Sequence, residues 1–266
     1  MLRFTSLASG SNGNATLIEG RREPGERPTR VLVDCGLGPR RLAAALASRD
    51  VAVAELDAVF VTHEHSDHVG GVLALQRRWG IAVWASEGTW AGATAGRGET
   101  AAAHVARDGH AFTIGAITLH PFAVPHDAAE PLQLVCDDGT RRLGIVTDLG
   151  EPTSAAVLAL QGCDALLLEC NHDREMLAEG PYPAWLKRRI GGMRGHLAND
   201  QAAMLLDACR HGGLRHVVAA HLSRQNNRPD LALSALRRAS ADGNRAGSTK
   251  LHVADGDHGC EWIELD

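Results

Sequence analysis

The chain has 266 residues, of which 44% are hydrophobic and 22% charged, close to the globular average, so wholesale disorder is excluded. Its apolar runs, such as residues 165–168, are far shorter than the roughly 20 residues of a bilayer span. The net charge of -5 provides no overall positive field for nucleic acid, so such affinity requires a local basic patch. We expect one domain over 1–266 in a soluble, cytoplasmic protein without a membrane partner.

Cysteine and histidine usage points to the kind of site that the chain carries. The six cysteines are scattered without a C-x-x-C pair, which argues against a disulfide scaffold and against a cysteine zinc finger. Histidine is unusually frequent, with 14 residues. Because a neutral imidazole is the commonest protein ligand for transition metals, the positions of these histidines decide whether a metal site is present.

The first half of the chain alternates short apolar runs with longer amphipathic ones. Residues 2–7 and 14–19 predict a hairpin around a turn rich in Gly and Asn, since both residue types tolerate positive φ. The Gly- and Ala-rich stretch 88–103 predicts a loop or a weak helix. The other elements predicted in this half are strands over 30–34, 58–62 and 81–85 and helices over 39–48 and 70–79.

From residue 112 a second block of strands begins, followed by alternating helices and strands. Asp138-Gly139 joins two of these strands and is a strong hairpin signal. The predicted strands are 112–114, 117–122, 132–136, 143–147, 165–169, 216–220, 250–253 and 261–264, and the predicted helices are 153–161, 199–209 and 229–239. Two such blocks predict two sheets face to face with helices outside, a four-layer αββα sandwich of the α/β (α+β) class.

The most informative stretch is T-H-E-H-S-D-H, residues 62–68. It follows a predicted strand and therefore lies on a loop at the carboxyl end of that strand, the usual place for sites in α/β sheets. His63 and His65 are two apart in extended backbone and point to one side, whereas Asp67 and His68 come a turn later and face a second point nearby. The alternative is a solvated polar loop, but this arrangement favours two metals that share one loop.

Two divalent ions need more ligands than one loop supplies, because each zinc takes about four donors. Three further residues each follow a predicted strand: His126 after 117–122, Asp148 after 143–147 and His221 after 216–220. A lone histidine is more often an ordinary surface or core residue than a ligand. Three such residues at strand ends favour ligands over this alternative.

These residues carry a resemblance to a known family. T-H-E-H-S-D-H, with an upstream V-D-C-G and with His126, Asp148 and His221 downstream, resembles the metallo-β-lactamase superfamily of metal-dependent hydrolases over essentially the whole chain. The segments S-L-A-S-G-S-N-G-N-A, E-C-N-H-D, L-K-R-R-I, G-H-L-A-N-D and H-L-S-R-Q-N-N resemble the bacterial YycJ-like (VicX-like) group. The members of that group are regarded as exonucleases acting on DNA phosphodiesters and are similar in layout to tRNase Z.

The resemblance implies two divalent ions per chain, Zn²⁺ or Mn²⁺. It implies one ion held by His63, His65 and His126, and a second held by Asp67, His68 and His221, with Asp148 bridging. Two such ions lower the pKa of a bridging water, and the resulting hydroxide attacks phosphorus, with Asp67 orienting it or taking its proton. Asp34 would be a buried carboxylate that keeps loop histidines in the right tautomer, unless it is only a strand-end turn residue.

His196 in G-H-L-A-N-D is the candidate for protonating the leaving oxygen, because it lies on a loop entering a predicted helix. By resemblance to tRNase Z this position is a catalytic histidine rather than a ligand. The family pattern usually has Ser where Ala198 stands, which puts a hydroxyl contact or helix cap in doubt. A surface helix-capping histidine is the alternative. Glu169 and His172 end the neighbouring strand and would support His196, unless they only make that loop polar.

Two segments are candidates for substrate contact. The S-G-S-N-G-N turn, with Asn12 and Asn14, could hold a phosphate on successive N–H groups, although most such turns are only hairpins. A basic cluster precedes His196 in a stretch, 184–199, that has no acidic residue; it consists of Lys187, Arg188, Arg189 and Arg194. This cluster could follow a nucleic-acid backbone, and a solvated helix face is the competing interpretation.

The function that we expect is metal-dependent phosphodiester hydrolysis, by a DNA exonuclease. Asp148 favours a phosphodiesterase or thioesterase centre over β-lactam hydrolysis, for which the superfamily often has Cys there. The alternative is a small-molecule hydrolase of the same fold, such as a glyoxalase II-like thioesterase, a lactonase or a phosphodiesterase on cyclic or modified nucleotides. The 4% aromatic content suits that alternative, since few rings are available to stack bases. A third hypothesis is a non-enzymatic, metal-dependent module, which the full set of predicted ligands disfavours.

Overall fold

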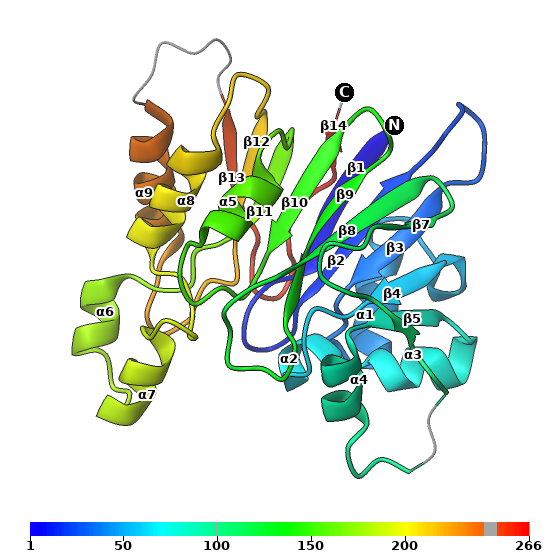
Figure 1. Cartoon of the computed structure of the whole chain (residues 1–266), viewed down its shortest axis with the longest axis horizontal. Helices are drawn as coiled ribbons and strands as arrows, with labels where there is room; N and C mark the ends of the chain where they lie inside the picture. Colours follow the sequence, from blue (N-terminus) through cyan, green and yellow to red (C-terminus); the bar gives the residue numbers. More distant parts are fainter. Residues whose placement is uncertain (99–100, 242–248, 266) are drawn as a thin grey trace.

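The structure, a computed structural model, describes residues 1–98, 101–241 and 249–265 (Figure 1). In this part of the chain the strands form two seven-stranded sheets. The first sheet has the order β14-β1-β2-β3-β4-β5-β6, with β1 to β3 and β14 antiparallel and β3 to β6 parallel. Its strands are β1 (Leu2–Ala8), β2 (Ala15–Gly20), β3 (Thr29–Val33), β4 (Ala58–Phe60), β5 (Ala82–Ala85), β6 (His104–Val105) and β14 (Ile263–Leu265).

The second sheet has the order β13-β12-β11-β10-β9-β8-β7. Strands β10 to β13 are parallel to one another, whereas β7 to β10 pair antiparallel. The predicted hairpin at Asp138-Gly139 joins β9 and β10, and Gly139 has φ 88°, which favours glycine. The strands are β7 (Phe112–Ile114), β8 (Ile117–Ala123), β9 (Leu132–Asp137), β10 (Arg142–Val146), β11 (Ala165–Glu169), β12 (His216–Ala220) and β13 (Lys250–Val253).

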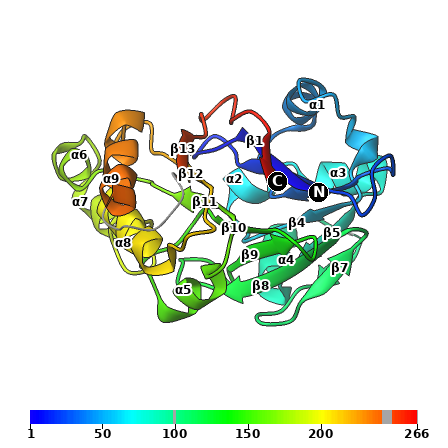
Figure 2. The ribbon, with the colours of Figure 1, turned by 90° about the horizontal axis from the view of Figure 1, so that it is seen from above.

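Helices cover the outer face of each sheet, so the chain has four layers (Figures 1 and 2). On the first sheet lie α1 (Pro39–Ala47), α3 (Val72–Trp79) and α4 (Glu87–Thr94), and on the second lie α5 (Ser154–Leu160), α8 (Asn199–Cys209) and α9 (Pro229–Ala241). The predicted αββα sandwich is therefore confirmed. The shorter described helices are η1 (Val53–Glu55), α2 (Ser66–Val69), α6 (Arg174–Glu179) and α7 (Ala184–Ile190).

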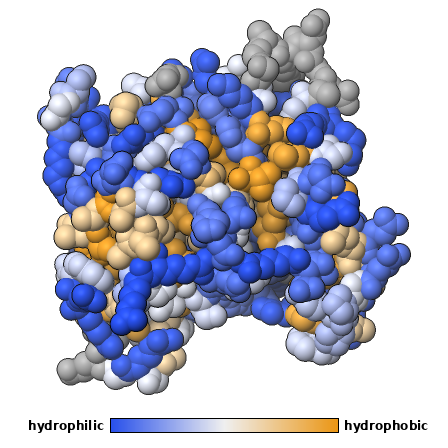
Figure 3. Space-filling view, turned by 180° about the vertical axis from the view of Figure 1, so that it is seen from behind, coloured by the Kyte–Doolittle hydropathy of each residue, from blue (hydrophilic) through white to orange (hydrophobic). Residues whose placement is uncertain are grey.

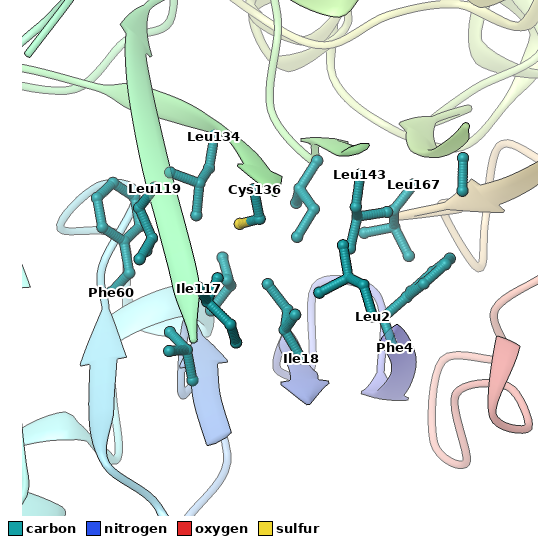
Figure 4. Close-up of a cluster of buried hydrophobic side chains, with 14 of the residues drawn as sticks. Leu2, Phe4, Ile18, Phe60, Ile117, Leu119, Leu134, Cys136, Leu143 and Leu167 are labelled. Carbon is teal, nitrogen blue, oxygen red and sulfur yellow. The ribbon is translucent and has the colours of Figure 1, made fainter. Parts of the chain in front are cut away.

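Three apolar cores hold these layers together. In β3, Val31 and Val33 face the other sheet while Leu32 faces the helices, which is the two-residue alternation of a strand that is buried on both faces. Figure 4 shows the core between the sheets, where Phe4 and Ile18 meet Leu143 and Leu167. Each such side chain contributes about 1.5–3 kcal/mol when it leaves water, so the sheets form a firm base for the loops at their edges.

The observed elements follow the predictions most closely where strands are buried, and differ from them elsewhere. The stretch predicted as a loop or weak helix contains α4, whose first turn is capped by Ser86 because its Oγ accepts from the Thr89 N–H at 3.1 Å; residues 99–100 of that stretch lie outside the described part. The last strand lies at 263–265 rather than 261–264. Strand β6 was not predicted, nor were α2, α6 and α7 as helices.

Among the described residues, no helix is both long and apolar enough to span a bilayer.

Candidate metal centre

All seven predicted ligand residues lie together at one edge of the two sheets. The strands β8, β10, β11 and β12 run in the same direction, so the residues that follow them meet at that edge. The loop after β4 comes to the same place from the first sheet. The ligating atoms fall into overlapping groups within 4.8 Å of one another, among them His63 with His65 and His126, and Asp67 with His68 and His221.

The first group consists of three imidazoles with one nitrogen of each turned inward. His63 Nε2 lies 3.0 Å from His65 Nδ1, and His126 Nε2 lies 3.3 Å from the same atom. Zinc–nitrogen bonds of about 2.0–2.1 Å put tetrahedral ligands roughly 3.3 Å apart, so this spacing fits a single ion. On the far side of two of the rings, His63 Nδ1 lies 3.0 Å from the Thr62 hydroxyl and His126 Nδ1 donates to the Gly195 carbonyl at 2.9 Å. Such bonds hold the rings in the tautomer that leaves the inner nitrogen free.

The second group lies beside the first and contains Asp67, His68 and His221. Asp67 Oδ2 lies 3.5 Å from His68 Nε2 and 3.6 Å from His221 Nε2. Asp148 lies between the groups, because its Oδ2 is 3.0 Å from His68 Nε2 and its Oδ1 is 3.8 Å from His126 Nε2. A carboxylate in this position can contact both groups.

Asp34 supports this second group from below, in a strained backbone conformation. It has φ 61°, in the left-handed region that non-glycine residues rarely adopt. Its Oδ2 accepts from His68 Nδ1 at 2.8 Å, and its Oδ1 accepts from the Thr62 N–H at 2.8 Å. One buried carboxylate therefore orients His68 and anchors the start of the segment 62–68, which we call the histidine loop.

His221 adopts the same unusual conformation, with φ 54°. Its backbone N–H donates to Ser9 Oγ at 2.7 Å, and its Nδ1 donates to the Thr147 carbonyl at 2.8 Å. Ser9 belongs to the turn that we considered for phosphate binding, and its contact with His221 was not predicted. The turn between β1 and β2 thus helps to hold a predicted ligand residue from the other sheet.

The V-D-C-G segment packs against the histidine loop without space for a side chain. A Cβ atom at Gly36 would lie 1.8 Å from the carbonyl oxygen of Asp67. In addition, the Cys35 N–H donates to the His68 carbonyl at 2.7 Å, and the Gly71 N–H donates to the Cys35 carbonyl at 2.7 Å. The glycine is therefore needed for the close backbone contact that fixes the position of Asp67 and His68.

Burial and neighbouring charges shift the pKa values of these groups in opposite directions. Burial lowers the pKa of His63 well below its ordinary value, and the His68 ring next to it adds to that effect. Burial also disfavours the cationic form of His68, but Asp148 and Asp34 outweigh it and raise its pKa well above the ordinary value. Burial would raise the pKa of Asp148, yet His221 and His68 lower it well below. The carboxylates here thus require positive charge close by.

A divalent cation fits this requirement, as one buried atom shows. His221 Nε2 has no hydrogen-bond partner among the described residues, although it is buried beside the other predicted ligands. An unpaired buried polar atom is costly. Nitrogen and oxygen donors together are the set that zinc and manganese accept, so the residues present fit the divalent ions that were predicted.

His196 lies over the metal centre at its solvent side. Its Nδ1 is 2.8 Å from Glu169 Oε1 and 3.2 Å from Asp148 Oδ1, and its side chain is 19% exposed. Burial lowers its pKa, but the charge of Glu169 and the hydrogen bond with Asp148 outweigh this and raise the pKa to about 9. His196 is therefore a cation at neutral pH.

Glu169 and His172, which we expected to support His196, differ in their contacts with it: among the described bonds, only Glu169 contacts His196 directly. Glu169 is fully buried and accepts from the Leu149 and Leu197 N–H groups as well as from His196. His172 is buried too, but it has no direct contact with His196 among the described bonds; its carbonyl accepts from the Asn199 N–H at 2.8 Å. Burial lowers the pKa of His172 to about 4.

The residues considered for substrate contact are placed in several different ways. Asn14 is buried, and its amide lies 3.3 Å from Asp67 Oδ2 and 2.9 Å from His68 Nε2, so it contacts two of the predicted ligands. Asn12 is exposed on the turn. Of the exposed arginines, Arg194 donates to the His126 carbonyl at 2.9 Å.

Asp127 was not singled out from the sequence, yet it lines the first group. Its Oδ1 is 3.4 Å from His126 Nε2 and 3.8 Å from His65 Nε2, and this oxygen has no hydrogen-bond partner within the part of the chain that the structure describes. Its Oδ2 accepts from Arg189 Nε at 2.5 Å. The P-H-D order was visible in the sequence, but only the fold shows that this second residue also points at the site.

Known proteins share both the sequence and the fold. A family model described as "Beta-lactamase superfamily domain" matches residues 29–222. The chain is 35% identical over 233 residues to "Exodeoxyribonuclease YycJ" of Bacillus anthracis, covering 87% of this chain and 86% of that protein. It is 33% identical over 236 residues to "Exodeoxyribonuclease WalJ" of Streptococcus pneumoniae, covering 86% and 85%.

One solved structure shows the same fold over the full length. The metallo-β-lactamase fold protein YhfI from Bacillus subtilis superposes with a TM-score of 0.71 at 17% identity, covering 99% of this chain and 100% of that one. The resemblance drawn from the histidine motif and from the shorter segments is thereby confirmed.

Proposed function

The chain belongs to the β-lactamase superfamily and is a hydrolytic enzyme, and from this premise we propose that it is a metal-dependent DNA exonuclease. The relatives named exodeoxyribonucleases match it over most of its length, which supports DNA as substrate. The observation that carries the proposal is the position of His196, whose cationic imidazole is held at the open side of the metal centre. A thioesterase has no evident need for such an acid, whereas a phosphodiester has an alkoxide leaving group.

The seven ligand residues would hold two divalent ions, Zn²⁺ or Mn²⁺. The first would be held by His63, His65 and His126, the second by Asp67, His68 and His221, and Asp148 would be shared. When bound, such ions supply charge stabilisation for the phosphoryl oxygens and acidify water. These are the ligand roles that the family resemblance implies.

The remaining chemistry is assigned to the side chains of this chain. Attack by a water oxygen on phosphorus releases one proton, which the Asp67 carboxylate, whose side chain is 21% exposed, would accept. The P–O bond to the leaving oxygen breaks, and that oxygen takes a proton from Nε2 of His196. Because Glu169 and Asp148 hold Nδ1 of this ring, its Nε2 is the nitrogen that remains for the substrate.

The experiment compares four substrates. The protein loaded with manganese is incubated with end-labelled single-stranded DNA, duplex DNA, bis(p-nitrophenyl) phosphate and a glutathione thioester. We expect stepwise loss of terminal nucleotides from DNA, and loss of this activity with a chelator. Cleavage of the thioester with intact DNA would overturn the proposal in favour of a small-molecule hydrolase.

His196→Ala serves as the site variant and His110→Ala as its control, since His110 is exposed and its ring contacts the Asp108 carbonyl rather than a predicted ligand. DNA cleavage that follows metal loading and is lost only in the site variant would locate the activity at this centre. Equal cleavage by both variants would point to a contaminating nuclease.

A further inference from the structure

The helix α7 lies at the edge of the metal centre and is held there by polar contacts rather than by packing. None of its residues is buried. Arg189 Nε donates to Asp127 Oδ2 at 2.5 Å, and Lys187 Nζ donates to the Ala178 carbonyl at 2.6 Å. In Figure 1, α6 and α7 project from the body on one side of α2, which carries Asp67 and His68. A helix without buried residues contributes little to the core, so its exposed side chains are available for another role.

The segment after α7 fixes the helix against the loop that carries Asp148. A Cβ atom at Gly150 would lie 2.1 Å from the Met193 carbonyl oxygen, so the two backbones are in direct contact. Arg194 follows and donates to the carbonyl of His126. The helix is therefore positioned by contacts with two metal-site loops. The space-filling view from behind shows the α6–α7 pair projecting at the lower right, with a hollow between it and the region of α4 (Figure 3).

Trp185 is the most unusual side chain on this helix, because it is 61% exposed. Tryptophan normally buries a large area, so such exposure beside a site points to a ligand that covers the ring. Arg189 follows four residues later on the same face of the helix and reaches the metal centre through Asp127. Four residues of helix rise about 6 Å, so the indole lies roughly one helical turn from Arg189 along the helix.

Arg188 supplies a charge next to this ring. Its side chain is exposed, and it makes no hydrogen bond or ion pair with any residue that the structure describes. The chain has no acidic residue from 184 to 199, so nothing in this segment neutralises it. By contrast, the guanidinium of Arg189 is already paired. Arg188 is thus the arginine of this helix that remains available for a phosphate.

We propose that Trp185 and Arg188 form a subsite for the nucleic-acid strand next to the bond that is cut. The indole stacks on one base and the Arg188 guanidinium binds a neighbouring phosphate. This inference rests on the proposed function and adds to it the part of the chain that grips the polymer. Base–aromatic stacking tolerates every sequence, since each base has a π-face, and this suits an enzyme that removes successive nucleotides.

The exposed apolar side chains at this end of the molecule could also contact a protein, as Met193 is 69% exposed. The charge decides between the two partners. A ring beside an unpaired arginine, in a stretch with no acidic residue, matches a polyanion that has flat bases. A protein partner is therefore an outcome of the test rather than the proposal.

The test measures binding of a single-stranded phosphorothioate oligonucleotide to the metal-loaded protein by fluorescence anisotropy. Trp185→Ala and Arg188→Gln should each weaken binding by roughly 5- to 20-fold, and Trp185→Phe should keep most of the affinity, because a smaller ring still stacks. Leu158→Ala and Arg40→Gln are matched controls, since Leu158 is 71% exposed and Arg40 is exposed, and neither lies in this helix. Both controls should bind as the unchanged protein does.

A scan with abasic sites separates stacking from a general loss of structure. In the unchanged protein one abasic position near the cleaved end should lower affinity by an amount similar to the Trp185→Ala change. In the Trp185→Ala protein the same abasic position should not lower the affinity for the oligonucleotide any further. Additive losses, or no loss in either protein, would refute the stacking role. Melting temperatures equal to that of the unchanged protein exclude unfolding as the cause.

The outcome for this subsite can be told apart from the outcome for the proposed function. DNA degradation that continues at unchanged KM in both helix variants would reject the subsite and leave the exonuclease in place. Absence of DNA degradation by the unchanged protein would reject the exonuclease itself. Undiminished DNA binding by Trp185→Ala would reject base stacking in favour of a protein contact at this face.

Discussion

The guanidinium of Arg189 and the carboxylate of Asp127 lie 2.5 Å apart and connect the basic helix α7 to the metal centre. The second oxygen of Asp127 faces His126 and His65, so this one residue contacts both parts of the site. Burial opposes ionisation of Asp127, but the hydrogen bond from Arg189 outweighs it and lowers the pKa of the carboxyl. The two predicted clusters, the ligands and the arginines, are therefore physically linked.

Asp127→Asn should weaken the first metal site while leaving the fold intact. The substitution removes a negative charge beside His126 and His65 and releases Arg189, and residues that support ligands typically contribute 10- to 100-fold to metal affinity. Competition with a chromophoric zinc chelator measures this loss. Asp57→Asn, which also removes an arginine partner, is the control because Asp57 pairs with Arg27 away from the site. Equal affinity in the two variants would contradict the role of Asp127.

The metal content itself is a prediction. Purified protein should hold about two equivalents of zinc or manganese per chain, and adding metal to the stripped protein should raise its melting temperature, since an ion that binds only the folded state stabilises it. Elemental analysis and a thermal shift assay check both. A double change, His63→Ala with His65→Ala, should leave about one equivalent, because the second group retains its own donors. A stripped protein that binds no metal would remove the basis of the proposed chemistry.

His196→Ala should keep both ions but lose most of the DNA cleavage, by about 10²–10⁴-fold, because a positioned acid is absent when the alkoxide leaves. Metal content is the internal control, since His196 is not among the proposed ligands. A variant with near-normal kcat would exclude this histidine from proton transfer.

The pH profile should show the influence of Glu169 on that acid. With the pKa of His196 raised to about 9, cleavage should decline as the pH rises through this value and the imidazole loses its proton. Glu169→Gln removes the charge that contributes most to that increase, so the alkaline decline should move to lower pH. A mere structural defect would lower kcat without moving the profile, and rescue by Glu169→Asp would support the electrostatic reason.

The parts that the sequence predicted well are those with a local signal. Buried strands show up as short runs of branched apolar residues, and residues directly after them, such as Asp148 and His221, fall at one edge because the strands are parallel. The histidine loop has three histidines and two acidic residues within six positions, and core packing cannot explain so many polar side chains together. Hence the layer order and the ligand set could be proposed before any coordinates.

The parts that were missed depend on tertiary placement. Helix α7 has no buried stripe, so periodicity provides no signal for it, and Asp127 becomes part of the site only because Arg189 reaches it from that helix. The left-handed conformations of Asp34 and His221 are likewise imposed by their partners, Thr62 and Ser9, which are distant in sequence. No local pattern in the chain carries this information.

His172 should make the stability of the fold sensitive to acid. Its pKa is about 4 in the folded protein because of burial, against 6.5 for an ordinary histidine, so the unfolded chain binds the proton first as the pH falls. Its contribution is complete above pH 6.5 and is lost as the pH falls toward 4, by about 3 kcal/mol in the free energy of unfolding.

Urea denaturation at several pH values tests this sign. His172→Gln, which cannot titrate, should lose about 3 kcal/mol less than the unchanged protein between pH 7 and pH 4. His258→Gln is the control, because His258 is exposed. Parallel stability curves for the unchanged protein and the His172 variant would show that the buried ring does not control this step.

Gly36→Ala should destabilise the fold and the second metal site together. The added methyl group would lie 1.8 Å from the Asp67 carbonyl, so the histidine loop must move, and overpacking of this kind costs about 3 kcal/mol. Gly38→Ala is a matched control two residues away, because φ there is −62° and no atom lies within 4 Å of the new Cβ. Denaturation and zinc titration of both variants should show a large change in the first and almost none in the second. Equal behaviour of the pair would mean that the loop tolerates the shift and that the close contact with Asp67 does not set the metal site.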